Sequence, residues 1–110
     1  MAIESVPIGA SNTDVFVATG DKMIATMIFC NVALPNPLQD DSNTTFLDIH
    51  LVKSGDLVTP INKIVNALMI PAGETVFFDT ERIVLANGDK VVASTTSPAV
   101  VTCTISTVDI

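Results

Sequence analysis

Two stretches of this chain each contain a run of alternating apolar and polar side chains, and this period limits the fold more than any other feature of the sequence. In the first stretch, residues 45–53, the alternating side chains are Leu47, Asp48, Ile49, His50 and Leu51. In the second stretch, residues 99–110, hydroxyl side chains alternate with Val101, Cys103 and Ile105. Because successive side chains of a β-strand point to opposite faces of its sheet, both stretches are predicted to be strands with one buried face. Asp48 and His50 then lie on the solvent face.

Further strands are predicted between turns that contain glycine or proline, at residues 14–19, 23–32, 75–79, 82–86 and 90–96. The stretch 23–32 is apolar on both faces, which is typical of a strand covered on both sides. Asn87-Gly88 predicts a tight β-hairpin between the last two stretches, because both central residues of a type I′ turn need positive φ. The segment 61–68 fits a helix as well as a strand, and a strand that ends at Ile70 is favoured.

The number and spacing of these strands predict the fold class. About eight short strands separated by turns are typical of a β-sandwich or barrel. The chain of 110 residues shows no internal repeat and no linker. We therefore expect an all-β, single-domain antiparallel β-sandwich, jelly-roll-like, over residues 1–110, with residues 1–13 as an N-terminal arm.

The composition indicates that this fold has more apolar surface than its own charges can cover. Apolar residues make up 48% of the chain and charged residues 15%, against about 25% charged residues in an average globular domain. Large exposed apolar patches usually mark interaction sites, so a protein partner is expected. The candidate contact surfaces are the strand at residues 23–29, the Phe77-Phe78 pair and the N-terminal arm, and the residues chosen from them are Met23, Ile24, Met27, Phe77 and Phe78. Each of them would alternatively belong to the core of the domain.

The charges argue against two other classes of partner. The net charge is −7, and the five basic residues are scattered singly through the sequence. Binding to nucleic acid or to an anionic membrane needs clustered Lys and Arg, so neither is expected. The longest apolar run, residues 23–34, is also shorter than the roughly 20 residues of a membrane-spanning helix. The acidity is interpreted as keeping an apolar subunit soluble before it docks.

The residue types that carry catalysis are sparse in this sequence. The only histidine, His50, could act as a general base beside Asp48, but a hydrolase would also need a nucleophile and a pocket around this pair. Two solvated side chains are the favoured interpretation, so no catalytic residue, enzyme activity or cofactor is predicted. Cys30 and Cys103 match no metal-binding spacing and are interpreted as buried free thiols, with a disulfide between them left open.

One loop, residues 35–43, carries clustered oxygen atoms. Its polar tip consists of Asp40, Asp41, Ser42 and Asn43. The spacing differs from that of an EF-hand loop, so an exposed loop is favoured over a calcium site. The same loop could serve a receptor- or glycan-binding module. That function is less favoured, because glycan sites rely on aromatic platforms and the chain has no Trp or Tyr.

The C-terminal part of the sequence, from Ile70 to Ile110, reads IPAGETVFFDTERIVLANGDKVVASTTSPAVVTCTISTVDI. This string resembles the C-terminal half of small virion structural proteins of tailed bacteriophages, particularly those of cyanophages. In that family a similar Ile-Pro-Ala-Gly opens a strand, and a Ser/Thr/Ala-rich hairpin ends on a hydrophobic residue. The earlier segment MIATMIFCNVA, residues 23–33, is similar to a strand of the same family.

The resemblance implies a role in the particle and no active-site residues. A member of this family would be a head decoration, neck or tail component that binds capsid, neck or tail proteins. It would assemble in the host cytoplasm, in line with an N-terminus that shows no secretory signal, and would reside in the virion. It would form a homo-oligomer, for which a trimer is one arrangement. A capsid decoration or neck accessory is favoured over a tail-fibre part, because one compact domain leaves no elongated shaft.

Overall fold

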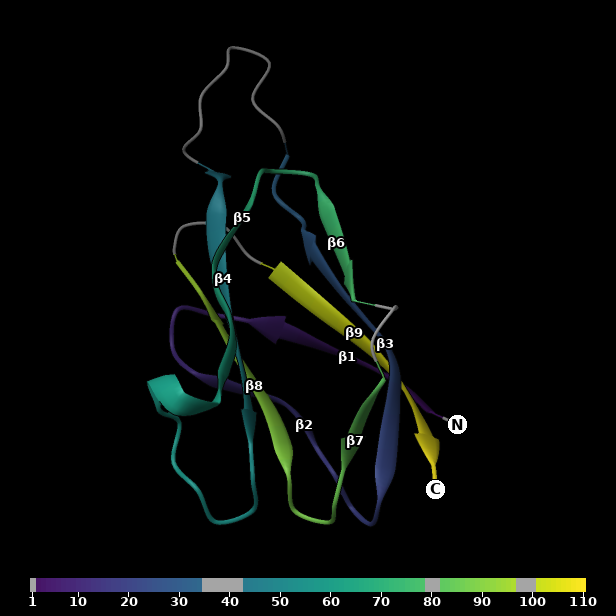
Figure 1. Ribbon diagram of the computed structural model, residues 1–110. Coiled ribbons are helices and arrows are strands. Elements are labelled where there is room, and N and C mark those ends of the chain that lie inside the picture. The colour runs from purple at the N-terminus through teal and green to yellow at the C-terminus, as the bar shows by residue number, and fades with distance from the viewer. Residues whose placement is uncertain (1, 35–42, 79–81, 97–100) are drawn as a thin grey trace.

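The computed structural model describes residues 2–34, 43–78, 82–96 and 101–110, and nearly all of its regular elements are β-strands (Figure 1). The strands are β1 (Ala2–Ile8), β2 (Thr13–Val17), β3 (Lys22–Asn31), β4 (Thr45–Val52), β5 (Lys63–Ile70), β6 (Thr75–Phe78), β7 (Ile83–Leu85), β8 (Lys90–Thr95) and β9 (Val101–Asp109). A short 3-10 turn, η2 (Pro60–Asn62), precedes β5.

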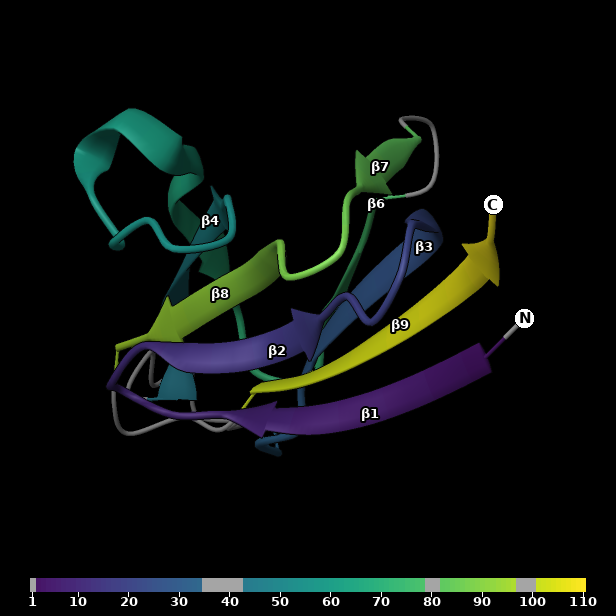
Figure 2. The same cartoon turned by 90° about the horizontal axis from the view of Figure 1, so that it is seen from below.

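The strands form two antiparallel sheets that pack face to face, which confirms the predicted β-sandwich (Figure 2). The five-stranded sheet has the order β1-β9-β3-β6, and β7 pairs with the same edge of β3 as β6 does. The four-stranded sheet has the order β2-β8-β4-β5. With β6 and β7 counted as one interrupted strand, this is the strand order of an eight-stranded jelly roll.

The core lies between the sheets, where the predicted alternation places apolar side chains. In β9, Val101, Cys103 and Ile105 are buried, as the period-two pattern predicts. Phe29 of β3 has the largest fully buried side chain. Its ring lies edge-on to that of Phe78, with centroids 5.7 Å apart. Burying a side chain of this size stabilises the fold by about 1.5–3 kcal/mol.

Strand β3 differs from its sequence-based prediction, because only its inner face is covered. A β-bulge between Ile24 and Thr26 shifts its register against β9, so Ile24 and Met27 both face the core and are buried. The side chains that face away from the core, and that are partly exposed, are Met23, Thr26, Ile28 and Cys30. The apolar pattern on both sides of this strand therefore reflects an apolar outer surface.

The predicted hairpin at Asn87-Gly88 is wrong. Strand β7 pairs with β3 in one sheet, and β8 pairs with β2 and β4 in the other, so the turn crosses between sheets. Gly88 has a φ of 90°, whereas Asn87 does not adopt positive φ. The turn is held by the segment before β3, because the amide of Gly88 donates to the carbonyl of Ala18 at 2.8 Å.

Strand pairing shows the structure of two segments, residues 63–70 and residues 2–8. Residues 63–70 form β5, paired with β4, which confirms a strand that ends at Ile70. The expectation of an N-terminal arm is wrong for residues 2–8. These residues pair with β9, from Ala2 opposite Thr107 to Ile8 opposite Val101, and form an edge of the five-stranded sheet.

Candidate protein-binding face

The side chains of the five-stranded sheet that point away from the core form one face, which we call the outer face. Strand pairing arranges them in rows across the sheet. One row contains Ser5, Thr104, Ile28 and Phe77. A second row, separated from the first by Ile3, Ser106 and Thr26, contains Val108, Met23 and Val84. The other members are Ile3, Pro7, Thr26, Cys30, Thr75, Thr102 and Ser106.

None of these outer-face residues carries a charge, although the chain has a net charge of −7. Charged groups lie at the margins. Arg82 precedes β7, and its Nη1 donates to the carbonyl of Ala25 at 3.4 Å. Lys22 forms an ion pair with Asp109, and the hydrogen bond from Lys22 lowers the pKa of the Asp109 carboxyl. A partner can therefore cover the outer face without removing a charge from water, which is the costly part of burying surface.

The outer face combines exposed apolar side chains with hydroxyl groups. Phe77, Val84 and Ile3 are 59%, 63% and 72% exposed. On the edge strand β1 and its neighbour β9, the hydroxyls of Ser5 and Thr104 lie 3.1 Å apart and form a hydrogen bond with each other. A surface of this kind suits a protein partner, because apolar area is buried on contact and the hydroxyls of Ser5 and Thr104 already bond to each other.

The structure divides the predicted contact residues between this face and the core. Met23 and Phe77 lie on the outer face. Ile24 and Met27 are each 1% exposed, so their prediction as contact residues is wrong. Phe78 faces inward and is partly buried against the core cluster. The change of face within β3 follows from its bulge, which interrupts the period of two.

Sequence reasoning missed one exposed member of the outer face, Val84. This residue alternates with two inward neighbours, Ile83 and Leu85. That alternation is the signal that could have identified it. The prediction that the hydroxyl side chains of β9, from Thr102 to Ser106, lie on the face away from the core is confirmed.

Asp48 and His50, the pair considered for a hydrolase, are each held by other parts of the fold. The Asp48 Oδ1 accepts a hydrogen bond from the amide of Ala67 at 2.7 Å, and its Oδ2 lies 3.6 Å from the ammonium of Lys63. His50 was expected in solvent but is only 6% exposed. Its Nδ1 lies 2.8 Å from Oδ1 of Asn62, in the segment that leads into β5. Both side chains thus shape the β4–β5 connection.

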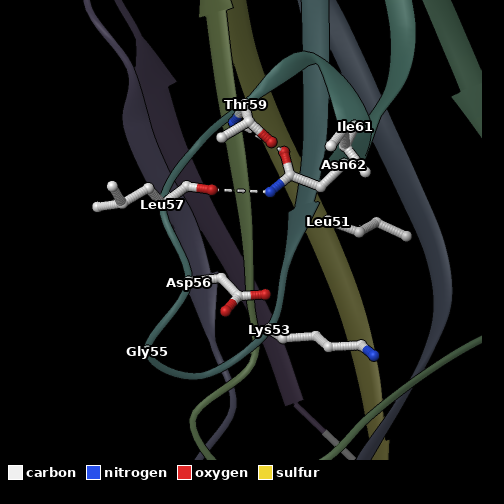
Figure 3. A pocket seen from close by; sticks show the side chains of 8 residues that line it. All are labelled: Leu51, Lys53, Gly55, Asp56, Leu57, Thr59, Ile61 and Asn62. Atoms are coloured by element: carbon white, nitrogen blue, oxygen red, sulfur yellow. Dashed lines mark hydrogen bonds between the residues drawn. The ribbon is translucent and has the colours of Figure 1, made fainter.

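An open hollow of about 600 Å³ lies beside this connection (Figure 3). It is lined by Leu51, Lys53, Gly55, Asp56, Leu57, Thr59, Ile61 and Asn62. Figure 3 shows that Leu51 and Lys53 extend to one side of β4, whereas Leu57 points the opposite way. His50 is not part of this lining. Within the lining, the Asn62 side chain accepts a hydrogen bond from the amide of Thr59 at 3.2 Å and donates one to the carbonyl of Leu57 at 2.9 Å, so it holds the loop that borders the hollow.

The candidate cation loop lies largely outside the described residues, which exclude Asp40, Asp41 and Ser42. Asn43 is described, and its carbonyl accepts a hydrogen bond from Nδ2 of Asn31 at 2.8 Å. Among the residues that the structure describes, no group of three or more His, Cys, Asp or Glu side chains is placed to hold a metal ion.

Cys30 and Cys103 lie on adjacent strands but on opposite faces of the sheet, and both thiols are free. Burial raises the pKa of the Cys103 thiol to about 12. At about pH 8, where an ordinary thiol is partly ionised, we expect the native protein to react with one equivalent of a thiol-specific reagent, at Cys30. The second equivalent should be consumed only after unfolding. Two rapidly reacting thiols in the native protein would contradict this placement.

Comparison of the chain with protein-family models, with curated proteins and with solved structures found no match. Within the described part of the chain, no helix has the length and apolar character needed to cross a membrane. The class of protein defined by the fold is an antiparallel β-sandwich of jelly-roll strand order, and one side of its five-stranded sheet forms the outer face.

Proposed function

We propose that this chain is a non-enzymatic structural protein of a tailed-phage particle, a capsid decoration or neck accessory, that binds neighbouring subunits through its outer face. The observation that carries the proposal is the uncharged outer face, on which Phe77 and Val84 are more exposed than buried. Two further observations support it. Jelly rolls occur among viral capsid domains, and the sequence from Ile70 onward resembles small virion proteins of tailed phages.

The charge distribution supports the same role. With a net charge of −7, single subunits repel one another and stay soluble until specific contacts form. The acidic residues that the structure describes lie off the outer face, so this repulsion does not oppose a contact made there. Such a subunit needs no catalytic group, because its function is the surface that it presents.

The proposal is tested by incorporation into particles. Host cells expressing a tagged copy of the chain are infected, and the tag is quantified in purified virions. We expect the native chain to be incorporated and Val84→Lys to be incorporated at least about tenfold less, because a charge on the contact surface costs more than 1 kcal/mol. Ile61→Lys is the matched control, since Ile61 is exposed on η2, away from the outer face.

Two outcomes would contradict the proposal. One is absence of the native chain from the particles. The other is equal incorporation of the two lysine variants, which would place the contact elsewhere. Adsorption of the purified chain to host cells without incorporation would instead favour the receptor- or glycan-binding module.

A further inference from the structure

We propose that the outer face is covered by the same face of a second copy of this chain, related by a two-fold axis that runs parallel to the strands. This inference rests on the proposed function, because it names the neighbour that the protein-binding face receives. It replaces the trimeric arrangement considered from the sequence with a symmetric pair. The charge and the shape of the face favour the second copy as the occupant, and the area of the face sets the strength of the pair.

The charge argument concerns what an uncharged face can recognise. A basic or an acidic partner would gain no counter-charge from the described side chains of the outer face, which are all neutral, and the one described charge beside β7, Arg82, is bonded to the carbonyl of Ala25. Two copies that meet through any acidic surface would repel, because each carries a net charge of −7. Contact between two outer faces keeps the described acidic side chains at the margins, as the Lys22–Asp109 pair illustrates.

The shape argument concerns the two margins of the face. A large side chain, Phe77, projects from the β6 margin. Two small side chains, Ser5 and Thr104, occupy the same row toward the β1 margin, and the exposed Ile3 of β1 lies in the next row. A two-fold axis parallel to the strands reverses the order of strands across the interface. Within the row of Phe77 it therefore places the Phe77 ring of one copy over the smaller side chains of Ser5 and Thr104 of the second copy.

The area argument sets the strength of the pair. Strands lie about 4.8 Å apart and rise about 3.3 Å per residue, so four strand widths and the length of β9 give a footprint of roughly 550 Å². The side chains roughen this footprint and bring its accessible area into the lower range of specific interfaces, about 600 Å² per partner. We therefore expect dissociation in the micromolar range, and a stronger pair only when neighbours in a particle hold it in place.

Cross-linking through Cys30 tests the geometry. Packed sheets lie about 10 Å apart, and the axis passes between β9 and β3, so Cys30 on β3 lies half a strand spacing from it and the two Cys30 Cα atoms are roughly 11 Å apart. That separation is too long for a disulfide, which needs about 4.4–6.8 Å, but it suits a short bismaleimide. We expect the bismaleimide to give a covalent dimer and mild oxidation to give none. Cys30→Ser should abolish the cross-link, whereas Cys103→Ser should retain it, because Cys103 is buried.

Charge variants at Thr104 test the contact in solution by sedimentation or light scattering. Thr104→Lys and Thr104→Glu should each weaken the pair at least about tenfold, because each places two like charges near the axis. An equal mixture of the two variants should restore it. Ser94→Lys is the matched control, since Ser94 is equally half-buried but lies opposite Asp48 on the other sheet. If the Thr104 variants unfold, Phe77→Ser at an exposed position provides the same test.

A native chain that stays monomeric above the micromolar range and forms no cross-link would overturn the pair. A trimer, or a dimer insensitive to Thr104 and Phe77 variants, would overturn it as well. These results are separable from the proposed function. Incorporation into particles by a strictly monomeric chain would leave the function standing without the pair, and a dimer absent from particles would leave the pair without the function.

Discussion

Replacing Asn31 by Asp is expected to lower the free energy of unfolding by about 4 kcal/mol. Asn31 is fully buried at the end of β3. Its Nδ2 donates to the carbonyls of Asn43 and Ile70 at 2.8 and 3.0 Å, and its Oδ1 accepts from the amide of Ala33 at 3.1 Å. A carboxylate would retain the last bond but would set a buried charge against two carbonyl oxygens. Urea unfolding followed by circular dichroism measures the loss.

The pH dependence of this variant identifies the cause. The new carboxyl has its pKa raised in the folded state, because only its protonated form can donate to a carbonyl. Its penalty therefore grows as the pH rises above the unfolded value of about 3.9 and shrinks below it. Asn87→Asp is the control, since Asn87 Oδ1 only accepts a bond, from the amide of Gly20 at 2.7 Å. It should change stability by less than about 0.5 kcal/mol, and equal losses in both variants would refute the role of Asn31.

The β-sandwich could be predicted because its strongest signal is local. Period-two alternation in β4 and β9 places Leu47, Ile49 and Ile105 in the core, as observed. Each strand has one covered face, and an alternating pattern needs no long-range information to show it. The strands with which each strand pairs could not be predicted in this way. Asn87-Gly88 makes a turn in either topology, and the contacts that send β7 and β8 to different sheets involve Ala18, far away in the sequence.

The outer face could be predicted only in part, because one bulge decides which side chains of β3 belong to it. A shift of one residue moves every later side chain to the opposite face. The bulge between Ile24 and Thr26 therefore buries Met27 and exposes Ile28, the reverse of the simple alternation. No composition or turn signal in this stretch marks its position. The hydroxyl row of β9, in contrast, follows the uninterrupted period from Thr102 to Ser106.

The environment of His50 also depended on distant sequence. The alternation in β4 places its side chain away from the main core, and a solvent position followed from that. The connection that leads to β5 covers it instead, because Asn62 binds both the His50 ring and the carbonyl of Leu57, at 2.8 and 2.9 Å. A loop that folds back over a sheet leaves no periodic signal in the sequence.

Replacing Gly88 by Ala is expected to cost about 3 kcal/mol of unfolding free energy, from two sources. Gly88 has a φ of 90°, a conformation that strains any residue with a Cβ. An added Cβ would also lie 2.5 Å from Oγ and 2.9 Å from Cβ of Ser54. The turn cannot move away easily, because the Asp89 carboxylate accepts bonds from the amides of Ser54 and Ala86 at 2.9 and 3.0 Å. Thermal and urea unfolding measure the loss.

Two further variants separate strain from collision. Gly20 has a φ of 85° with open space around its Cβ position, so Gly20→Ala should show the strain alone, about 1 kcal/mol. Ser54→Gly removes both colliding atoms and leaves Cα as the nearest atom of that residue, at 3.9 Å. Added to Gly88→Ala, it should return the cost of the alanine to the Gly20→Ala level, a coupling of about 2 kcal/mol in the double-mutant cycle. Additive effects of Gly88→Ala and Ser54→Gly would show that the contact with Ser54 does not cause the extra cost of Gly88→Ala.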